Sequence, residues 1–180
     1  HNTPAIGDAV RLQQFDIGIV SRSPPYLGVH SLYQTEVNYV ALVPQNHSLA
    51  ASKDRLDLRE VAGREEFITF GNVYPLEMQG MDEDLAAQFQ NKARYSVANV
   101  LAATALVRAV GVPALVDPFS ARISASAGGM VVRPIQQKLT YHIGIITRGI
   151  EVMNRETRQL ADALISKFEA DPLIVADGQS

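Results

Sequence analysis

The chain has 180 residues, of which 47% are hydrophobic, and it carries a formal net charge of −3 at pH 7. This composition is that of a globular protein with one large domain or two small lobes, and its interspersed charges exclude a basic stripe for binding nucleic acid. Because no apolar run reaches roughly 18 residues and cysteine is absent, we expect no membrane span, no disulfide and a cytoplasmic location.

The N-terminal third of the sequence predicts a helix followed by strands. Thr3 and Pro4 are typical of a helix N-cap and first helical position, and helical spacing of apolar residues continues to about residue 14. Residues 15–20 predict a buried strand in which Gly18 allows a neighbour to approach closely. The β-branched and aromatic segment 32–43 exceeds a mean strand of about 5–6 residues, so we expect it to cross between lobes.

The rest of the chain alternates between strand and helix patterns. Helices are predicted at residues 56–62, 75–90, 99–110 and 154–169, and strands at residues 66–71, 92–97, 113–116, 130–132 and 139–147. Asn99 is a predicted cap and Gly111 a predicted stop of the third of these helices. In the last helix, we expect the stripe of Leu160, Leu164 and Phe168 to lie in the core.

This alternation predicts an α/β architecture with mostly parallel sheets. Two extended segments, residues 36–44 and 138–147, are the candidate crossovers between two lobes. Two lobes joined in this way form a hinged clamshell whose strand ends face a shared cleft.

Motifs for catalysis and for metal or cofactor binding are absent from the sequence. The four histidines lie far apart, and no nucleophile elbow, phosphate-binding loop or dinucleotide-binding turn occurs. Gly128 and Gly129 instead suit a hairpin turn. We therefore expect no metal, no cofactor and no enzymatic activity, although paired carboxylates for acid–base chemistry stay open because nothing selects a pair.

Four segments together resemble one protein family. They are Phe15-Asp16-Ile17-Gly18-Ile19, then Val43-Pro44-Gln45-Asn46-His47-Ser48-Leu49-Ala50, then residues 56–68, and last Leu106-Val107-Arg108-Ala109 leading into Ala114-Leu115-Val116-Asp117. Their order and spacing resemble the effector-binding domain of LysR-type transcriptional regulators over essentially the whole chain. The sequence departs from the family pattern at Ser48, where proline is usual, and near Gly111, which alone is left of the usual glycines.

The resemblance implies a fold, a division into lobes and a function. The fold would be the type 2 periplasmic-binding-protein fold, with two Rossmann-like lobes joined by two crossovers. Lobe I would comprise residues 1–43 and 147–180, and lobe II residues 44–146. The family's N-terminal helix-turn-helix domain and the first strand, helix and second strand of lobe I are absent from this sequence, so DNA would be bound only through that absent domain.

The implied function is recognition of a small inducer in the cleft between the lobes, in a homodimer or homotetramer. The Asp117-Pro118-Phe119-Ser120-Ala121 continuation looks most like regulators of opine or amino-acid catabolism, such as those that respond to octopine or nopaline. That likeness implies a ligand with carboxylates and an amine or guanidinium.

The candidate inducer contacts are polar or aromatic residues at strand ends and helix starts: Asn2, Thr3, Ser21, Arg22, Ser23, Thr69, Gly71, Asn72, Asn99, Asp117 and Phe119. Thr3 and Thr69 resemble inducer-pocket positions of the family, and the forked guanidinium of Arg22 suits a carboxylate. Each also has a simpler explanation. Asn99 and Asp117 are good helix caps, Thr69 suits a strand-terminal hydrogen bond, and residues 21–23 suit a solvated loop.

Two other functions stay open on the sequence. One is an exported solute-binding receptor of the same fold, which an upstream signal peptide would identify. The other is an enzyme on a hinged α/β scaffold, in which Asp117 or Arg22 would be needed for turnover.

Overall fold

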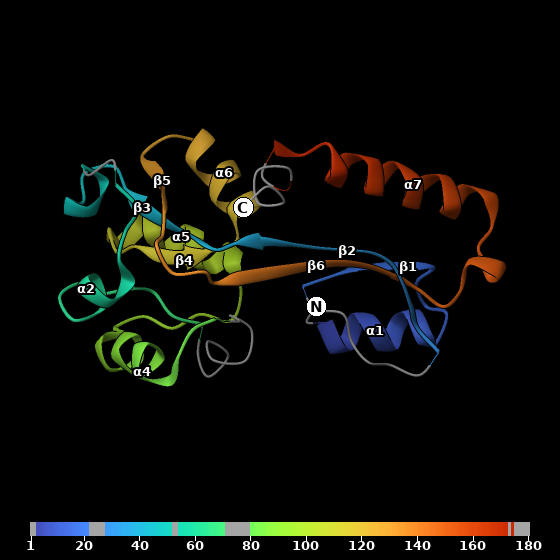
Figure 1. The fold of residues 1–180 in the computed structure, drawn as a ribbon, viewed down its shortest axis with the longest axis horizontal. Coiled ribbons are helices and arrows are strands. Elements are labelled where there is room, and N and C mark those ends of the chain that lie inside the picture. The colour runs from blue at the N-terminus through green and yellow to red at the C-terminus, as the bar shows by residue number, and fades with distance from the viewer. Residues whose placement is uncertain (1–2, 22–27, 52–53, 71–79, 173, 175–180) are drawn as a thin grey trace. The chain divides into compact units, whose positions relative to one another are not determined.

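The chain forms two units that each contain helices and strands (Figure 1), and the computed structural model describes residues 3–21, 28–51, 54–70, 80–172 and 174. Unit 1 comprises His1–Val37 and His142–Ser180, and unit 2 comprises Asn38–Tyr141. The sequence instead placed lobe II at residues 44–146. The boundary falls earlier at both passages because β3 (Val40–Pro44) pairs with strands of unit 2, and the second half of β6 (Thr140–Thr147) pairs with a strand of unit 1.

Unit 1 contains a three-stranded sheet in the order β1-β6-β2, with β1 at Ile17–Val20 and β2 at His30–Asn38. β1 runs antiparallel to β6, and Ile17 is opposite Thr147. Two helices, α1 (Thr3–Arg11) and α7 (Arg155–Glu169), lie on opposite sides of this sheet (Figure 1), and the short 3-10 helix η3 (Ile150–Val152) precedes α7.

Close contact between α1 and β1 depends on Gly18. A Cβ atom at this position would lie 2.5 Å from Cγ2 of Ile6 and 3.2 Å from Cγ2 of Val10, which confirms the predicted close approach. Val10 and Val20 are buried in the same cluster with Ile146. The prediction that the whole strand is buried was wrong, because Ile19 points away from this cluster and is 47% exposed.

The prediction that Leu160, Leu164 and Phe168 of α7 lie in the core was also wrong. Leu160 is 52% exposed, and the buried residues of this helix are Thr157 and Ala161. Thr157 and Ala161 are four residues apart and share a face, and Leu160 lies at the margin of that face. Phe168 is half-buried and stacks on Tyr33, with ring centroids 5.9 Å apart.

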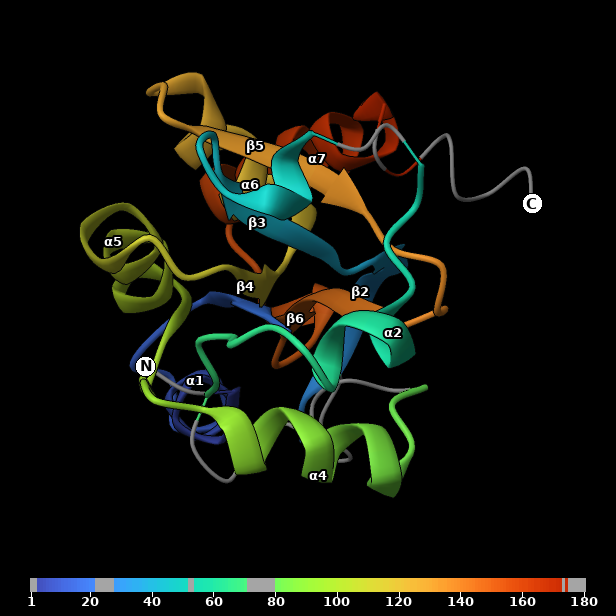
Figure 2. The ribbon, with the colours of Figure 1, turned by 90° about the vertical axis from the view of Figure 1, so that its left-hand side faces the viewer.

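Unit 2 contains a second three-stranded sheet in the order β4-β3-β5, with β4 at Ala114–Val116 and β5 at Met130–Pro134. Its helices are α2 (Leu58–Ala62), α4 (Glu83–Lys92), α5 (Val100–Val110) and α6 (Pro118–Ser126), and η1 (Ser48–Ala50) is a short 3-10 helix. α2 and α4 cover one face of the sheet, and α5 and α6 cover the other (Figure 2).

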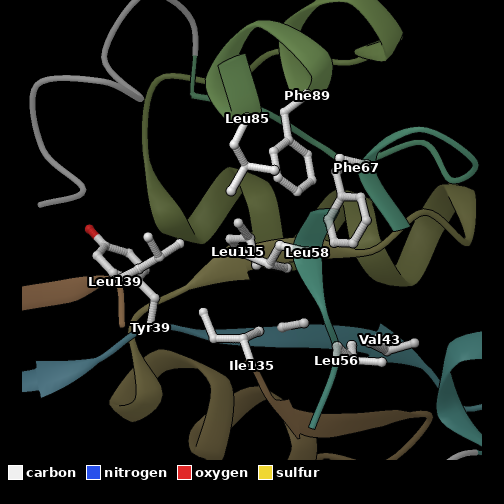
Figure 3. Packing of buried hydrophobic residues seen from close by; sticks show 12 residues of the cluster. Tyr39, Val43, Leu56, Leu58, Phe67, Leu85, Phe89, Leu115, Ile135 and Leu139 are labelled. Atoms are coloured by element: carbon white, nitrogen blue, oxygen red, sulfur yellow. The ribbon is translucent and has the colours of Figure 1, made fainter. Parts of the chain in front are cut away.

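The largest buried cluster of unit 2 lies under α2 and α4 (Figure 3). Leu85 and Phe89 of α4 point toward Leu58 and Leu115. The ring of Phe89 meets that of Phe67 edge to face, with centroids 4.9 Å apart, an arrangement that aromatic pairs favour. This cluster fixes the residues just before Thr69.

The prediction of mostly parallel sheets was wrong for the strands proper. β3 is antiparallel to both of its neighbours in the sheet, β4 and β5. The parallel pairings seen in the described part of the chain are single bridges, which join Leu56 to Ile135, Ile68 to Ala114 and Thr69 to Ser96. The predicted strands at 66–71 and 92–97 are reduced to two of these bridges.

Two further boundaries differ from prediction. Gly128 and Gly129 have left-handed φ values of 80° and 77°, but they join helix α6 to strand β5 and form no hairpin. Of the predicted helix 75–90, residues 80–82 are not helical, because Asp82 caps α4 at Glu83, and residues 75–79 lie outside the described part of the chain. None of the helices described is long and apolar enough to cross a bilayer.

Two aspartates cap helices of unit 2 and are joined through an arginine. Oδ1 of Asp57 accepts hydrogen bonds from Nε2 of Gln137 at 2.7 Å and from the backbone N–H of Arg59 at 2.9 Å. The guanidinium of Arg59 pairs with Asp82, whose Oδ1 accepts from the backbone N–H of Leu85 at 2.8 Å. These contacts link the N-termini of α2 and α4 to residue 137.

Replacing Gly18 by Ala tests the contact between α1 and β1. We expect a loss of about 1–3 kcal/mol in the free energy of unfolding, since the new methyl group overlaps a branched side chain that cannot swing away. Urea unfolding followed by circular dichroism measures it. The matched control is Gly63→Ala, where nothing lies within 4 Å and φ is −76°. Equal stability of the two variants would contradict the packing.

Acidification tests the two capping aspartates. The side chain of Gln137 and the N–H of Arg59 lower the pKa of Asp57 below its ordinary 3.8, and the N–H of Leu85, together with Arg59, lowers that of Asp82. Carboxylates with a lowered folded pKa stabilise the protein above their unfolded pKa and lose that effect as pH falls through the folded pKa.

We therefore expect the free energy of unfolding to fall as the pH drops below 3.8 in urea titrations. Gln137→Ala should make this fall shallower, because it removes the largest cause of the lowered pKa of Asp57. The same pH slope in both proteins would show that this contact does not perturb Asp57.

Candidate functional site

Polar residues gather where the parallel segments of unit 2 end. Thr69 pairs with Ser96, and the preceding Ile68 pairs with Ala114, in both cases parallel. The backbone N–H of Thr69 donates to Tyr95 at 3.0 Å, and that of Val97 donates to Thr69 at 2.8 Å. The carboxyl ends of these segments therefore lie at one edge, which is where open α/β sheets hold ligands. We call Thr69, Ser96, Asn99 and Asp117 the polar edge of unit 2.

Thr69 is the most deeply buried member of the polar edge, with 3% of its surface exposed. Its hydroxyl donates to the carbonyl of Tyr95 at 3.3 Å, which is the strand-terminal hydrogen bond considered from the sequence. A hydroxyl that donates one bond still has lone pairs that accept others. The structural role of Thr69 therefore leaves an acceptor available to a ligand donor.

Asn99 begins helix α5, as predicted. Its Oδ1 accepts a hydrogen bond from the N–H of Ala102 at 2.9 Å, and the helix ends at Gly111, whose φ is 75°. An α-helix has four N–H groups without intrahelical acceptors in its first turn, and they carry partial positive charge. The cap of α5 is a neutral amide, so that charge is not balanced by the capping side chain.

Asp117 caps helix α6 three residues after the bridged residue Ala114, just as Asn99 caps α5 three residues after the bridged residue Ser96. Oδ1 of Asp117 accepts from the N–H of Ser120 at 2.8 Å, and Pro118 takes the first helical position. Only 8% of the residue is exposed. Because this cap is a carboxylate, it balances the partial charge of α6, and Oδ2 takes no part in the cap.

Phe119 has a neighbour that the sequence reasoning missed. The guanidinium carbon of Arg122 lies 5.9 Å from the centroid of the Phe119 ring, within the range of a cation–π contact. Their spacing of three residues on one helix is the signal that could have predicted it. A ligand that contacts Phe119, one of the predicted inducer contacts, must therefore share the ring with Arg122.

Ser96 is the second residue that the sequence reasoning left out of the site. It is exposed and directly opposite Thr69 in the parallel bridge. A serine near the end of the predicted strand 92–97 was the available signal. The structure therefore brings four residues to one edge of unit 2, namely Ser96 and the predicted contacts Thr69, Asn99 and Asp117.

The other predicted contacts are not part of this group. Ser21 follows β1, is half-buried and belongs to unit 1, as does Thr3, which begins α1 and whose side chain is outside the description. The remaining predicted contacts lie outside the described residues: Asn2, Arg22, Ser23, Gly71 and Asn72.

A second polar cluster, of His47, Ser48 and Glu65, has the residue types of a catalytic triad. Nδ1 of His47 accepts from the backbone N–H of Leu49 at 3.2 Å, and Nε2 lies 3.7 Å from Glu65. The hydroxyl of Ser48 donates to Oε1 of Glu65 at 3.3 Å and lies 3.5 Å from Nδ1 of His47, but that ring nitrogen already accepts from the N–H of Leu49. This cluster holds the turn before η1 against Glu65.

Metal ligands do not cluster in the described part of the chain, where no group of three or more His, Cys, Asp or Glu side chains is placed to hold an ion.

Comparison with known proteins gives one family. Residues 1–169 match the family described as the LysR substrate binding domain. No curated protein is detectably similar to the chain.

Solved structures share the fold. The effector-binding domain of QuiR in complex with shikimate is 19% identical, with a TM-score of 0.62 over 90% of this chain and 76% of that one. The Synechocystis PCC6803 CcmR regulatory domain in complex with 2-PG is 13% identical, with a TM-score of 0.67 over 92% and 79%. HinK, a LysR family transcriptional regulator from Pseudomonas aeruginosa, is 12% identical, with a TM-score of 0.65 over 93% and 57%. The predicted α/β fold of the type 2 periplasmic-binding-protein kind is confirmed.

Substitutions at Asn99 test its role as a cap. Asn99→Ala removes the acceptor for the N–H of Ala102 and should cost about 0.5–2 kcal/mol in the free energy of unfolding. Asn99→Asp keeps an acceptor and adds a charge that the helix N-terminus favours, so its stability should equal or exceed the wild type. Urea unfolding measures both. An Ala variant as stable as the wild type would show that the cap is not needed.

Proposed function

Because the chain belongs to the LysR substrate-binding domain family, we propose that it is the effector-sensing part of a transcriptional regulator. It binds a small metabolite and controls transcription through a DNA-binding domain elsewhere in the protein. The match of residues 1–169 to the family carries this proposal, and the polar edge of unit 2 supports it. The similar QuiR and CcmR domains were solved with small molecules bound.

The two helix N-termini at the polar edge support a ligand with both charges. The start of α5 has only the neutral cap of Asn99, so its first-turn N–H groups suit a carboxylate. The start of α6 already has the carboxylate of Asp117, whose Oδ2 suits a cationic nitrogen. An opine or an amino acid carries both groups.

Such an effector acts through binding energy alone. It changes transcription only if it binds one arrangement of the regulator more tightly than another. Family members are transcription regulators, so turnover of the effector is not part of the proposal. Asn2, Thr3, Ser21, Arg22, Ser23, Gly71, Asn72 and Phe119 stay predicted contacts.

We extend the proposal to the whole protein from the family alone. The chain spans 57% of HinK, so a further domain that binds DNA is expected in the full-length protein. A homodimer or homotetramer in the cytoplasm is the expected form.

The alternative of an exported solute-binding receptor has less support, since the matching family and HinK are of the LysR type. The gene sequence upstream decides between them. A helix-turn-helix there supports the regulator, and a signal peptide supports the receptor.

Calorimetric titration with octopine, arginine and an aromatic acid tests the effector class. We expect saturable binding of octopine. Asn99→Asp should raise the Kd at least about tenfold, because a second negative charge faces the ligand carboxylate, while the helix cap is kept. The matched control is Asn91→Asp, which adds the same charge at an exposed position of α4.

Asp117→Asn tests recognition of the cationic end of the ligand separately from recognition of its carboxylate. It keeps the capping oxygen but removes the charge, so binding of octopine should weaken more than binding of the aromatic acid. No saturable binding of octopine or arginine would contradict the opine and amino-acid assignment. Equal affinities of the wild type and Asn99→Asp would contradict a carboxylate at the start of α5.

A further inference from the structure

Arg133 is a buried arginine without an ion pair in the described part of the chain. It lies in β5, opposite Ala41 of β3, and 6% of its surface is exposed. Its Nη2 donates to the backbone carbonyl of Asp54, and its Nε is buried without a hydrogen-bond partner. An arginine is rarely buried unless it is paired, because moving a charge out of water is costly.

The contact of Arg133 with Asp54 lies at a junction that backbone contacts already hold. Leu56 forms a parallel bridge with Ile135, and the N–H of Leu56 donates to the carbonyl of Pro134 at 2.9 Å. A guanidinium has five N–H donors, and the bond to Asp54 uses one of them. Fixing the junction therefore does not account for the buried charge.

Arg55 carries a second guanidinium at the same junction. Its Nη1 donates to the carbonyl of Ile135 at 3.3 Å, and the residue is exposed. Over the residues that the structure describes, neither Arg55 nor Arg133 forms an ion pair with a carboxylate, whereas Arg59 of the same unit pairs with Asp82. The junction thus carries two positive charges that are bonded only to neutral carbonyls.

These donors suit an oxyanion. The flat, forked guanidinium matches two oxygens of a phosphate or a carboxylate, and such charge-assisted hydrogen bonds are stronger than those to a carbonyl. The net charge of the chain is −3, so its overall charge gives no general attraction for anions. Binding of an anion at this junction must therefore depend on the two local arginines.

We propose that Arg133 and Arg55 form a binding site for a small oxyanion, a phosphate or carboxylate group, where residues 54–56 meet the end of β5. The bound anion supplies the counter-charge for Arg133 and stabilises the folded chain by mass action. The site shares no residue with the polar edge of unit 2, so it is additional to the effector site and does not rest on it.

NMR titrations of the labelled chain with inorganic phosphate and, separately, with acetate test this site at an ionic strength held constant with sodium chloride. We expect the Nε–H of Arg133 and the amides of Arg55 and Ile135 to shift saturably with at least one of them, which also shows which oxyanion the site takes. Arg133→Met should raise the Kd at least about tenfold, because the buried cation is lost. Arg64→Met, at an exposed arginine that follows α2, is the matched control and should leave the Kd unchanged.

Arg55→Met keeps the test decisive if Arg133→Met does not fold, since Arg55 is exposed, and it should also raise the Kd. Shifts that do not saturate with either anion, or the same Kd in the wild type and in each folded variant, would overturn the proposal. Asn99→Asp should not affect this binding. If that substitution abolished it, the anion would be held at the start of α5 and the proposed site would be wrong.

Discussion

Parallel pairing of Thr69 with Ser96, and of Ile68 with Ala114, is the constraint on which the site depends. These two pairs align the ends of the three chain segments that contain Thr69, Ser96 and Ala114. Helices α5 and α6, which follow the second and third of these segments, therefore start at one edge. The buried cluster that contains Phe67 and Leu115 holds the pairing in place from below. Without that packing, Asn99 and Asp117 would still cap α5 and α6, but the two helix starts would not be held at the same edge of unit 2.

The two helix starts differ in charge, and this difference gives the edge its chemistry. Asp117 supplies its own negative charge to α6, whereas Asn99 leaves the partial positive charge of α5 unbalanced. A carboxylate from outside is therefore favoured at α5 and disfavoured beside Asp117. Capping and ligand recognition are compatible at both positions, because each cap uses only one of the two polar side-chain atoms.

Local signals in the sequence predicted the helix ends well and the sheets less well. Asn99, Asp117 and Gly111 act through contacts within a few residues, so their roles could be read from residue type and spacing. Strand direction depends on partners distant in sequence, which is why the antiparallel entry of β3 and the short bridges at Thr69 were not predicted. The exposure of Leu160 has the same origin, since periodicity alone does not choose which face of a helix packs.

The central claim is that the start of α5 receives the carboxylate of the effector. The direct measurement is an NMR titration of the labelled chain with octopine, following the backbone amides of Val100, Leu101 and Ala102. These amides are expected to shift saturably and more than the first amides of α6. Saturable shifts that spare the start of α5, or that centre on Ser120 at the start of α6, would contradict the account.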